Sequence, residues 1–274
     1  MRRRRFTTTR PGRGGHKRPT HLLSPRPSSG RGRVADPSLP TVLVSTADRF
    51  VSAAADAIAT RIANVIEARG RCRLVLAGGG TPRPIYEALV GREDVAWSAV
   101  DFFWGDERAV GPDHEQSNYR MAREALLDPL GVSDAHVFRI EGERSAAEAC
   151  DAYAVTLGDS PLDVVLLGMG GDGHTASLFP GDPASVEMTA AVVVTLSPKP
   201  PAVRISLSLS TINAAKHVVL LVAGSGKAER LAQVWRELAD GPQLPAARVR
   251  PTDGELLWLL DDAAAAALPQ QVIP

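Results

Sequence analysis

The chain has 274 residues, of which 44% are hydrophobic and 23% charged, a balance that is ordinary for a soluble enzyme with a sizeable core. Its two cysteines, Cys72 and Cys150, lie far apart and outside any CxxC spacing, which argues against a disulfide framework or a zinc site. No apolar run is long enough to cross a bilayer, and the Arg-rich start lacks the apolar segment of a secretory signal. We therefore expect a cytoplasmic protein with no membrane partner.

The net charge of zero hides an uneven distribution along the chain. Residues 1–40 hold 11 of the 31 basic residues but only one of the 31 acidic ones, Asp36. This Arg-rich extension has almost nothing apolar to bury, so we predict that it is disordered. A nucleic-acid-binding arm and an organelle transit peptide are the functional alternatives for it. The remaining residues, 41–274, are acidic overall and are predicted to form one domain without a nucleic-acid partner.

From Thr41 onward, short β-rich runs alternate with segments of helical pattern. Such alternation predicts an α/β fold, a Rossmann-like and mostly parallel sheet with helices on both faces. The expected strands cover 41–45, 73–77, 99–104, 162–167, 191–195, 203–208 and 217–223. The expected helices cover 47–68, 82–90, 115–127, 145–157, 226–239 and 254–267.

The first glycine cluster, Gly78-Gly79-Gly80-Thr81-Pro82, follows an apolar strand directly. Thr81 is expected to cap the next helix, and Pro82 suits its first position. Free backbone N–H groups and the positive end of the helix dipole then face one space, which favours binding of a phosphate at Gly79, Gly80 and Thr81. An ordinary strand-to-helix turn is the alternative interpretation.

Charged residues end the next strand in the run Gly105-Asp106-Glu107-Arg108. The planar fork of Arg108 matches phosphate oxygens, and a neighbouring carboxylate such as Asp106 can orient the arginine or act as a base. A solvated charge cluster is the alternative. Further along, Lys227 follows a strand and a glycine turn at the start of a helix, where its charge opposes the dipole unless an anion lies nearby.

The most informative stretch runs from Asp163 to Pro180, where an apolar strand leads into glycines that end on Asp172-Gly173-His174. Ligands bind beyond the carboxyl ends of parallel strands, so His174 is expected at the active site with Asp172 orienting its ring. Gly168 to Gly173 matches G-x-G-x-x-G literally, but no acid follows at the distance that a dinucleotide ribose requires. The run ending in Lys227 also lacks the residues of a Walker loop.

Together these motifs resemble the 6-phosphogluconolactonases, in the superfamily that also contains glucosamine-6-phosphate deaminase and ribose-5-phosphate isomerase. The resemblance covers residues 41–260 and includes Ser117-Asn118-Tyr119 and Arg204-Ile205-Ser206-Leu207. It implies hydrolysis of 6-phospho-D-glucono-1,5-lactone in the oxidative pentose phosphate pathway, with His174 as general base and no cofactor or metal. It also implies contacts of the phosphosugar with Asp106, Gly170, Gly171 and Arg204. We expect a monomer or a weak homo-oligomer.

Two other functions are weighed against this one. Glucosamine-6-phosphate deaminase shares the Asp-Gly-His loop, but its loop continues to a Glu where this sequence has Phe179, which removes an acid-base group. A sugar-phosphate-binding regulator would need a helix-turn-helix before the sensor, and residues 1–40 lack the apolar periodicity for one.

Overall fold

The computed structural model describes residues 40–270 and residue 272. The predicted extension, residues 1–40, lies outside this part of the chain except for Pro40. Its predicted disorder, and the prediction that residues 41–274 form a single domain, therefore stay predictions. None of the helices in the described part combines the length and the apolar character that crossing a bilayer requires.

A seven-stranded parallel sheet forms the centre of the described structure, with the strand order β1-β10-β9-β6-β2-β3-β5. Its strands, in chain order, are β1 (Thr41–Ser45), β2 (Cys72–Leu76), β3 (Val100–Trp104), β5 (Val137–Phe138), β6 (Val164–Gly168), β9 (His217–Val222) and β10 (Glu255–Asp261). Side chains such as Leu74, Val165 and Leu220 are fully buried, as expected for strands covered on both faces. The predicted parallel α/β sheet is confirmed.

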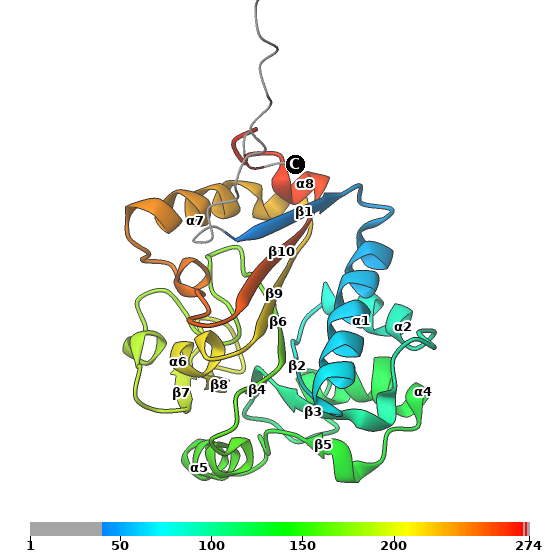
Figure 1. The fold of residues 1–274 in the computed structure, drawn as a ribbon. Coiled ribbons are helices and arrows are strands. Elements are labelled where there is room, and N and C mark those ends of the chain that lie inside the picture. The colour runs from blue at the N-terminus through cyan, green and yellow to red at the C-terminus, as the bar shows by residue number, and fades with distance from the viewer. Residues whose placement is uncertain (1–39, 271, 273–274) are drawn as a thin grey trace, which may run out of the picture. The chain divides into compact units, whose positions relative to one another are not determined.

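Helices cover this sheet, with α1 and α2 on one side and α7 on the other (Figure 1). The α-helices are α1 (Phe50–Arg69), α2 (Pro82–Leu89), α3 (Asn118–Ala122), α4 (Asp128–Leu130), α5 (Ala146–Leu157), α6 (Leu209–Asn213), α7 (Ala228–Asp240) and α8 (Asp262–Ala265). A π-helical turn, η2 (Arg123–Leu127), joins α3 to α4, and short 3-10 turns are η1 (Trp97–Ala99), η3 (Asp134–His136), η4 (Pro183–Val186), η5 (Ser225–Lys227) and η6 (Pro245–Arg248).

The predicted helix at 254–267 is wrong. Residues Glu255–Asp261 form β10, which lies between β1 and β9 in the sheet, and only Asp262–Ala265 are helical. The apolar run from Leu256 to Leu260 is too short for its periodicity to distinguish a buried strand from a buried helix. This segment forms a strand because it pairs with β1 on one side and β9 on the other. Its residues Leu257, Trp258 and Leu259 are almost completely buried in the core.

A second, antiparallel sheet of three strands was not expected. It has the order β4-β8-β7, where β4 is Asp106–Arg108, β7 is Val192–Leu196 and β8 is Val203–Leu207. The charged run after β3 is therefore a strand in its own right, and it pairs with β8 in a register that sets Arg108 opposite Arg204. This pairing brings two cationic residues, far apart in the chain, next to each other.

Candidate active site

Two cavities that share lining residues lie at the carboxyl ends of β2, β3, β6 and β9. The first has a volume of about 270 Å³ and the second about 330 Å³. Both are lined by Asp106, Arg108, Gly171, His174, Ala176 and Lys199. The first alone contains Gly79, Gly80, Thr81, Gly170 and Lys227, and the second alone contains Asp172 and Arg204. Every residue that the sequence predicted for the site thus lines one of these two cavities.

His174 and Asp172 form a hydrogen-bonded pair where the cavities meet. Nδ1 of His174 lies 2.5 Å from Oδ1 of Asp172, and the same oxygen accepts the backbone N–H of His174 at 3.2 Å. Burial raises the pKa of the Asp172 carboxyl, but the charge of His174 and these hydrogen bonds outweigh it and hold that pKa below its usual value. Since a carboxylate only accepts, Nδ1 carries the proton and Nε2 is left as the basic nitrogen.

The loop after β6, residues 169–175, has glycines where this pair needs room. A Cβ atom on Gly170 would lie 2.1 Å from Nδ1 of His174, so only glycine fits there. The loop is closed by the N–H of Gly170, which donates to the carbonyl of His174 at 2.8 Å, and Gly173 has a φ of +88°. On the other side, the Phe179 ring packs against the imidazole at 4.8 Å between centroids. The imidazole is therefore fixed by a hydrogen bond, a packed ring and a tight turn.

The glycine cluster after β2 forms the predicted turn into α2, which begins at Pro82. Gly79 has a φ of +100°, and a Cβ atom on Gly78 would overlap the side-chain amide of Asn118 at 1.9 Å. The predicted capping role of Thr81 is wrong, because its backbone is helical and its side chain accepts no capping hydrogen bond. A capping side chain needs an extended backbone, which Thr81 does not have. Thr81 lines the first cavity instead.

The acidic residues Asp106 and Glu107 are 7% and 2% exposed, so the alternative of a solvated charge cluster is wrong for this pair. Asp106 is held on both oxygens: Oδ1 accepts from Nδ2 of Asn118 at 3.2 Å, and Oδ2 accepts from Oγ of Ser177 at 2.5 Å. Ala176, the residue before Ser177, has a φ of +46°, a left-handed conformation that costs an L-residue free energy and recurs at functional sites.

The cations around the cavities are only partly compensated within the described residues. Arg204 is 6% exposed, and its Nε, like the buried Nε of Arg108, has no hydrogen-bond partner among them. Burial lowers the pKa of Arg204, and the adjacent charge of Arg108 lowers it further. Burial also lowers the pKa of Lys227, with Asp172 opposing and Lys199 adding to the shift. A buried cation whose donors are not all paired is costly, so an anion bound beside Arg204 would stabilise the site.

Lys199 is a site residue that the sequence reasoning missed. It lies between β7 and β8, in Ser197-Pro198-Lys199-Pro200-Pro201, and lines both cavities. No glycine motif marks it, and a lysine flanked by prolines was the only signal.

Within residues 40–270 and 272, no group of three or more His, Cys, Asp or Glu side chains is placed to hold a metal ion.

Comparison with known proteins gives a consistent result. Residues 45–258 match the family model of glucosamine-6-phosphate isomerases/6-phosphogluconolactonase. The chain is 40% identical to the 6-phosphogluconolactonase of Synechocystis sp., covering 76% of this chain and 89% of that protein. Identity to the enzyme of Nostoc sp. is also 40%, covering 80% and 94%. The structure resembles the 6-phosphogluconolactonase from Trypanosoma brucei with a TM-score of 0.74 and 32% identity, covering 84% and 99%. This chain belongs to the glucosamine-6-phosphate isomerase/6-phosphogluconolactonase family.

Proposed function

We propose that this chain hydrolyses 6-phospho-D-glucono-1,5-lactone to 6-phospho-D-gluconate, with His174 as the general base. The observation that carries this proposal is the His174–Asp172 pair at the junction of two cavities that cationic side chains surround. The names of the relatives support the same substrate.

The chemistry requires one group that takes up a proton and returns it. Nε2 of His174 takes a proton from water as the water oxygen attacks C1 of the lactone. The tetrahedral intermediate then collapses, the bond from C1 to the ring oxygen breaks, and His174 returns the proton to that oxygen. Asp172 keeps the imidazole in one orientation and stabilises its charged form in between. The acid formed ionises at neutral pH, so each turnover releases a proton.

Binding of the distant phosphate positions the reacting carbon. The backbone at Gly79 and Gly80 and the hydroxyl of Thr81 offer donors, and Arg108 and Lys227 supply positive charge. Arg204, opposite Arg108 in the β4–β8 ladder, lines the adjoining second cavity and adds positive charge beside that of Arg108. Asp106, Gly170 and Gly171 contact the sugar. Holding the substrate by its phosphate places C1 within about 3 to 3.5 Å of the attacking water.

The decisive experiment applies three readouts to the purified protein: acid release, ammonia release, and binding of sugar phosphates without turnover. We expect acid release from 6-phosphogluconolactone well above the spontaneous rate and no ammonia from glucosamine 6-phosphate. Ammonia release would favour a deaminase, although the apolar Phe179 packs against His174 where that chemistry needs an acid. Binding of sugar phosphates without turnover of either would favour a regulator. That the protein acts in the cytoplasm without cofactor, metal or nucleic acid, as a monomer or weak homo-oligomer, also remains our proposal.

A further inference from the structure

Glu107 is a buried carboxylate that the proposed reaction does not use. Its residue is 2% exposed, and it lines neither of the two cavities. Burial raises the pKa of the Glu107 carboxyl above its usual value, although four hydrogen bonds lower it in part. Burying an ionisable group in this way is costly, so its position between two cavity-lining residues calls for a physical reason.

Both oxygens of Glu107 accept two hydrogen bonds each. Oε1 accepts the backbone N–H groups of Arg108 and Asn118, both at 2.8 Å. Oε2 accepts the hydroxyl of Ser117 at 2.9 Å and the backbone N–H of Tyr119 at 2.8 Å. The carboxylate therefore joins β4 to the first turn of α3, where a negative charge is favourable.

The groups that Glu107 holds lead directly to the active site. Nδ2 of Asn118 donates to the backbone oxygen of Asp106 at 2.9 Å and to its Oδ1 at 3.2 Å. The Asn118 side chain also packs against Gly78 of the glycine turn. The guanidinium of Arg108 donates to the carbonyl of Gln116, just before the three consecutive residues, 117–119, that Glu107 binds. Asp106, Arg108 and Asn118 all line the first cavity.

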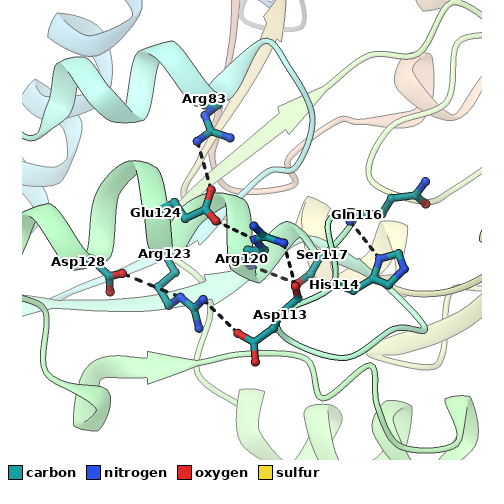
Figure 2. A network of polar contacts seen from close by, with 9 residues as sticks. All are labelled: Arg83, Asp113, His114, Gln116, Ser117, Arg120, Arg123, Glu124 and Asp128. Carbon is teal, nitrogen blue, oxygen red and sulfur yellow. Dashed lines mark hydrogen bonds and ion pairs between the residues drawn. The ribbon is translucent and has the colours of Figure 1, made fainter.

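The loop between Arg108 and α3 also makes contacts through Asp113, which binds residues of α3 and η2. Figure 2 shows Arg120 bonded to the carbonyl of Asp113 at 2.9 Å and Arg123 paired with the Asp113 carboxylate at 3.1 Å. Glu124 in turn bonds Arg120 at 2.7 Å. These pairs are partly exposed and contribute little each, whereas the bonds to Glu107 are buried. Glu107 thus joins β4 to the end of this loop through a buried carboxylate that accepts four hydrogen bonds.

We propose that Glu107 is a positioning residue, which fixes Arg108 and Asn118 and, through Asn118, Asp106 for binding of the phosphorylated substrate. This inference rests on the proposed function. It adds a residue that touches no substrate and acts through three residues that line the cavity.

The test is the isosteric variant Glu107→Gln. Whichever way its amide is oriented, the NH₂ group replaces an oxygen that accepts a backbone N–H, so two donors face each other. We expect KM for 6-phosphogluconolactone to rise about tenfold or more and kcat to stay within about threefold, the pattern of a lost binding interaction. The dissociation constant of 6-phosphogluconate, measured by calorimetry, should rise by a similar factor.

Asp163→Asn is the matched control. Asp163 is also 2% exposed and accepts hydrogen bonds from Arg69 and from the backbone N–H of Arg73, but it precedes β6, at the end of that strand away from the cavities. This variant should lose stability without a change in KM. A wild-type KM in folded Glu107→Gln, or an equal rise in KM for both variants, would overturn the proposal.

A milder variant covers the case in which Glu107→Gln does not fold. Ser117→Ala removes the hydroxyl that donates to Oε2 and that also caps α3 by accepting the N–H of Arg120, and it leaves the three backbone bonds to Glu107 in place. It should raise KM about two- to fivefold, and an unchanged KM would count against the proposal.

Binding of inorganic phosphate tests the role of Glu107 independently of the proposed lactonase function. If the wild type fails to hydrolyse the lactone, the proposed function is wrong, and ³¹P NMR titration with inorganic phosphate then decides the role of Glu107. About tenfold weaker phosphate binding in Glu107→Gln than in the wild type supports positioning. Equal binding, or no phosphate binding by the wild type, overturns it.

Discussion

Replacing Gly170 with alanine perturbs the proposed catalytic pair, His174 and Asp172, without removing either member. The new Cβ would lie 2.1 Å from Nδ1 and 2.2 Å from Cε1 of His174, and 2.5 Å from Oδ1 of Asp172. An ordinary contact needs at least 3.4 Å, so the imidazole has to move by roughly 1.3 Å. A misplacement of about 1 Å costs about 10²-fold in rate, or about 2.7 kcal/mol of transition-state stabilisation. We therefore expect kcat of Gly170→Ala to fall at least about 10²-fold.

The assay is the initial rate of acid release from 6-phosphogluconolactone, corrected for spontaneous hydrolysis. Gly226→Ala is the control, because a Cβ atom there meets nothing within 4 Å and Gly226 lines neither cavity. It should keep wild-type kcat, and both variants should bind 6-phosphogluconate. If Gly170→Ala turned over at the wild-type rate, the pair formed by His174 and Asp172 would not be the catalytic arrangement.

Two further predictions concern binding and stability. Arg108→Ala should raise KM for the phosphorylated lactone far more than for unphosphorylated gluconolactone, because the lost charge pairs with the phosphate; equal losses for both substrates would exclude that contact. Ala176→Gly should stabilise the fold by about 0.5 kcal/mol in urea unfolding, because relief of the roughly 1–2 kcal/mol cost of a φ of +46° exceeds the roughly 0.4–1 kcal/mol that the freedom of glycine in the unfolded chain costs. A loss of about 1 kcal/mol, the full entropic cost of glycine, would show that the turn holds no strain.

The glycine motifs were predictable because they depend on neighbours in the sequence. A short apolar run that ends in glycine indicates a buried strand and its turn, and the turns at Gly79, Gly170 and Gly224 follow β2, β6 and β9 as expected. Parallel strands end at one edge of the sheet, so their loops meet there. The grouping of His174 with the glycine turn at 78–81 needed no knowledge of packing.

Features that depend on pairing between distant segments were not predictable. The sequence of β10 is compatible with a helix, and its place between β1 and β9 decides otherwise. Arg108 lies opposite Arg204 because of the register of β4 on β8, which no local sequence pattern reveals. Glu107 appeared to belong to a charged surface, and only the fold of the chain at Ser117 and Asn118 around it explains its burial.

The central claim is that His174 transfers the proton in hydrolysis of the lactone. Its most direct test is kcat of His174→Ala in the acid-release assay, with affinity for 6-phosphogluconate measured in parallel. We predict a fall in kcat of roughly 10²- to 10⁴-fold with product affinity nearly unchanged, as loss of a general base requires. Full turnover by His174→Ala would contradict the mechanism.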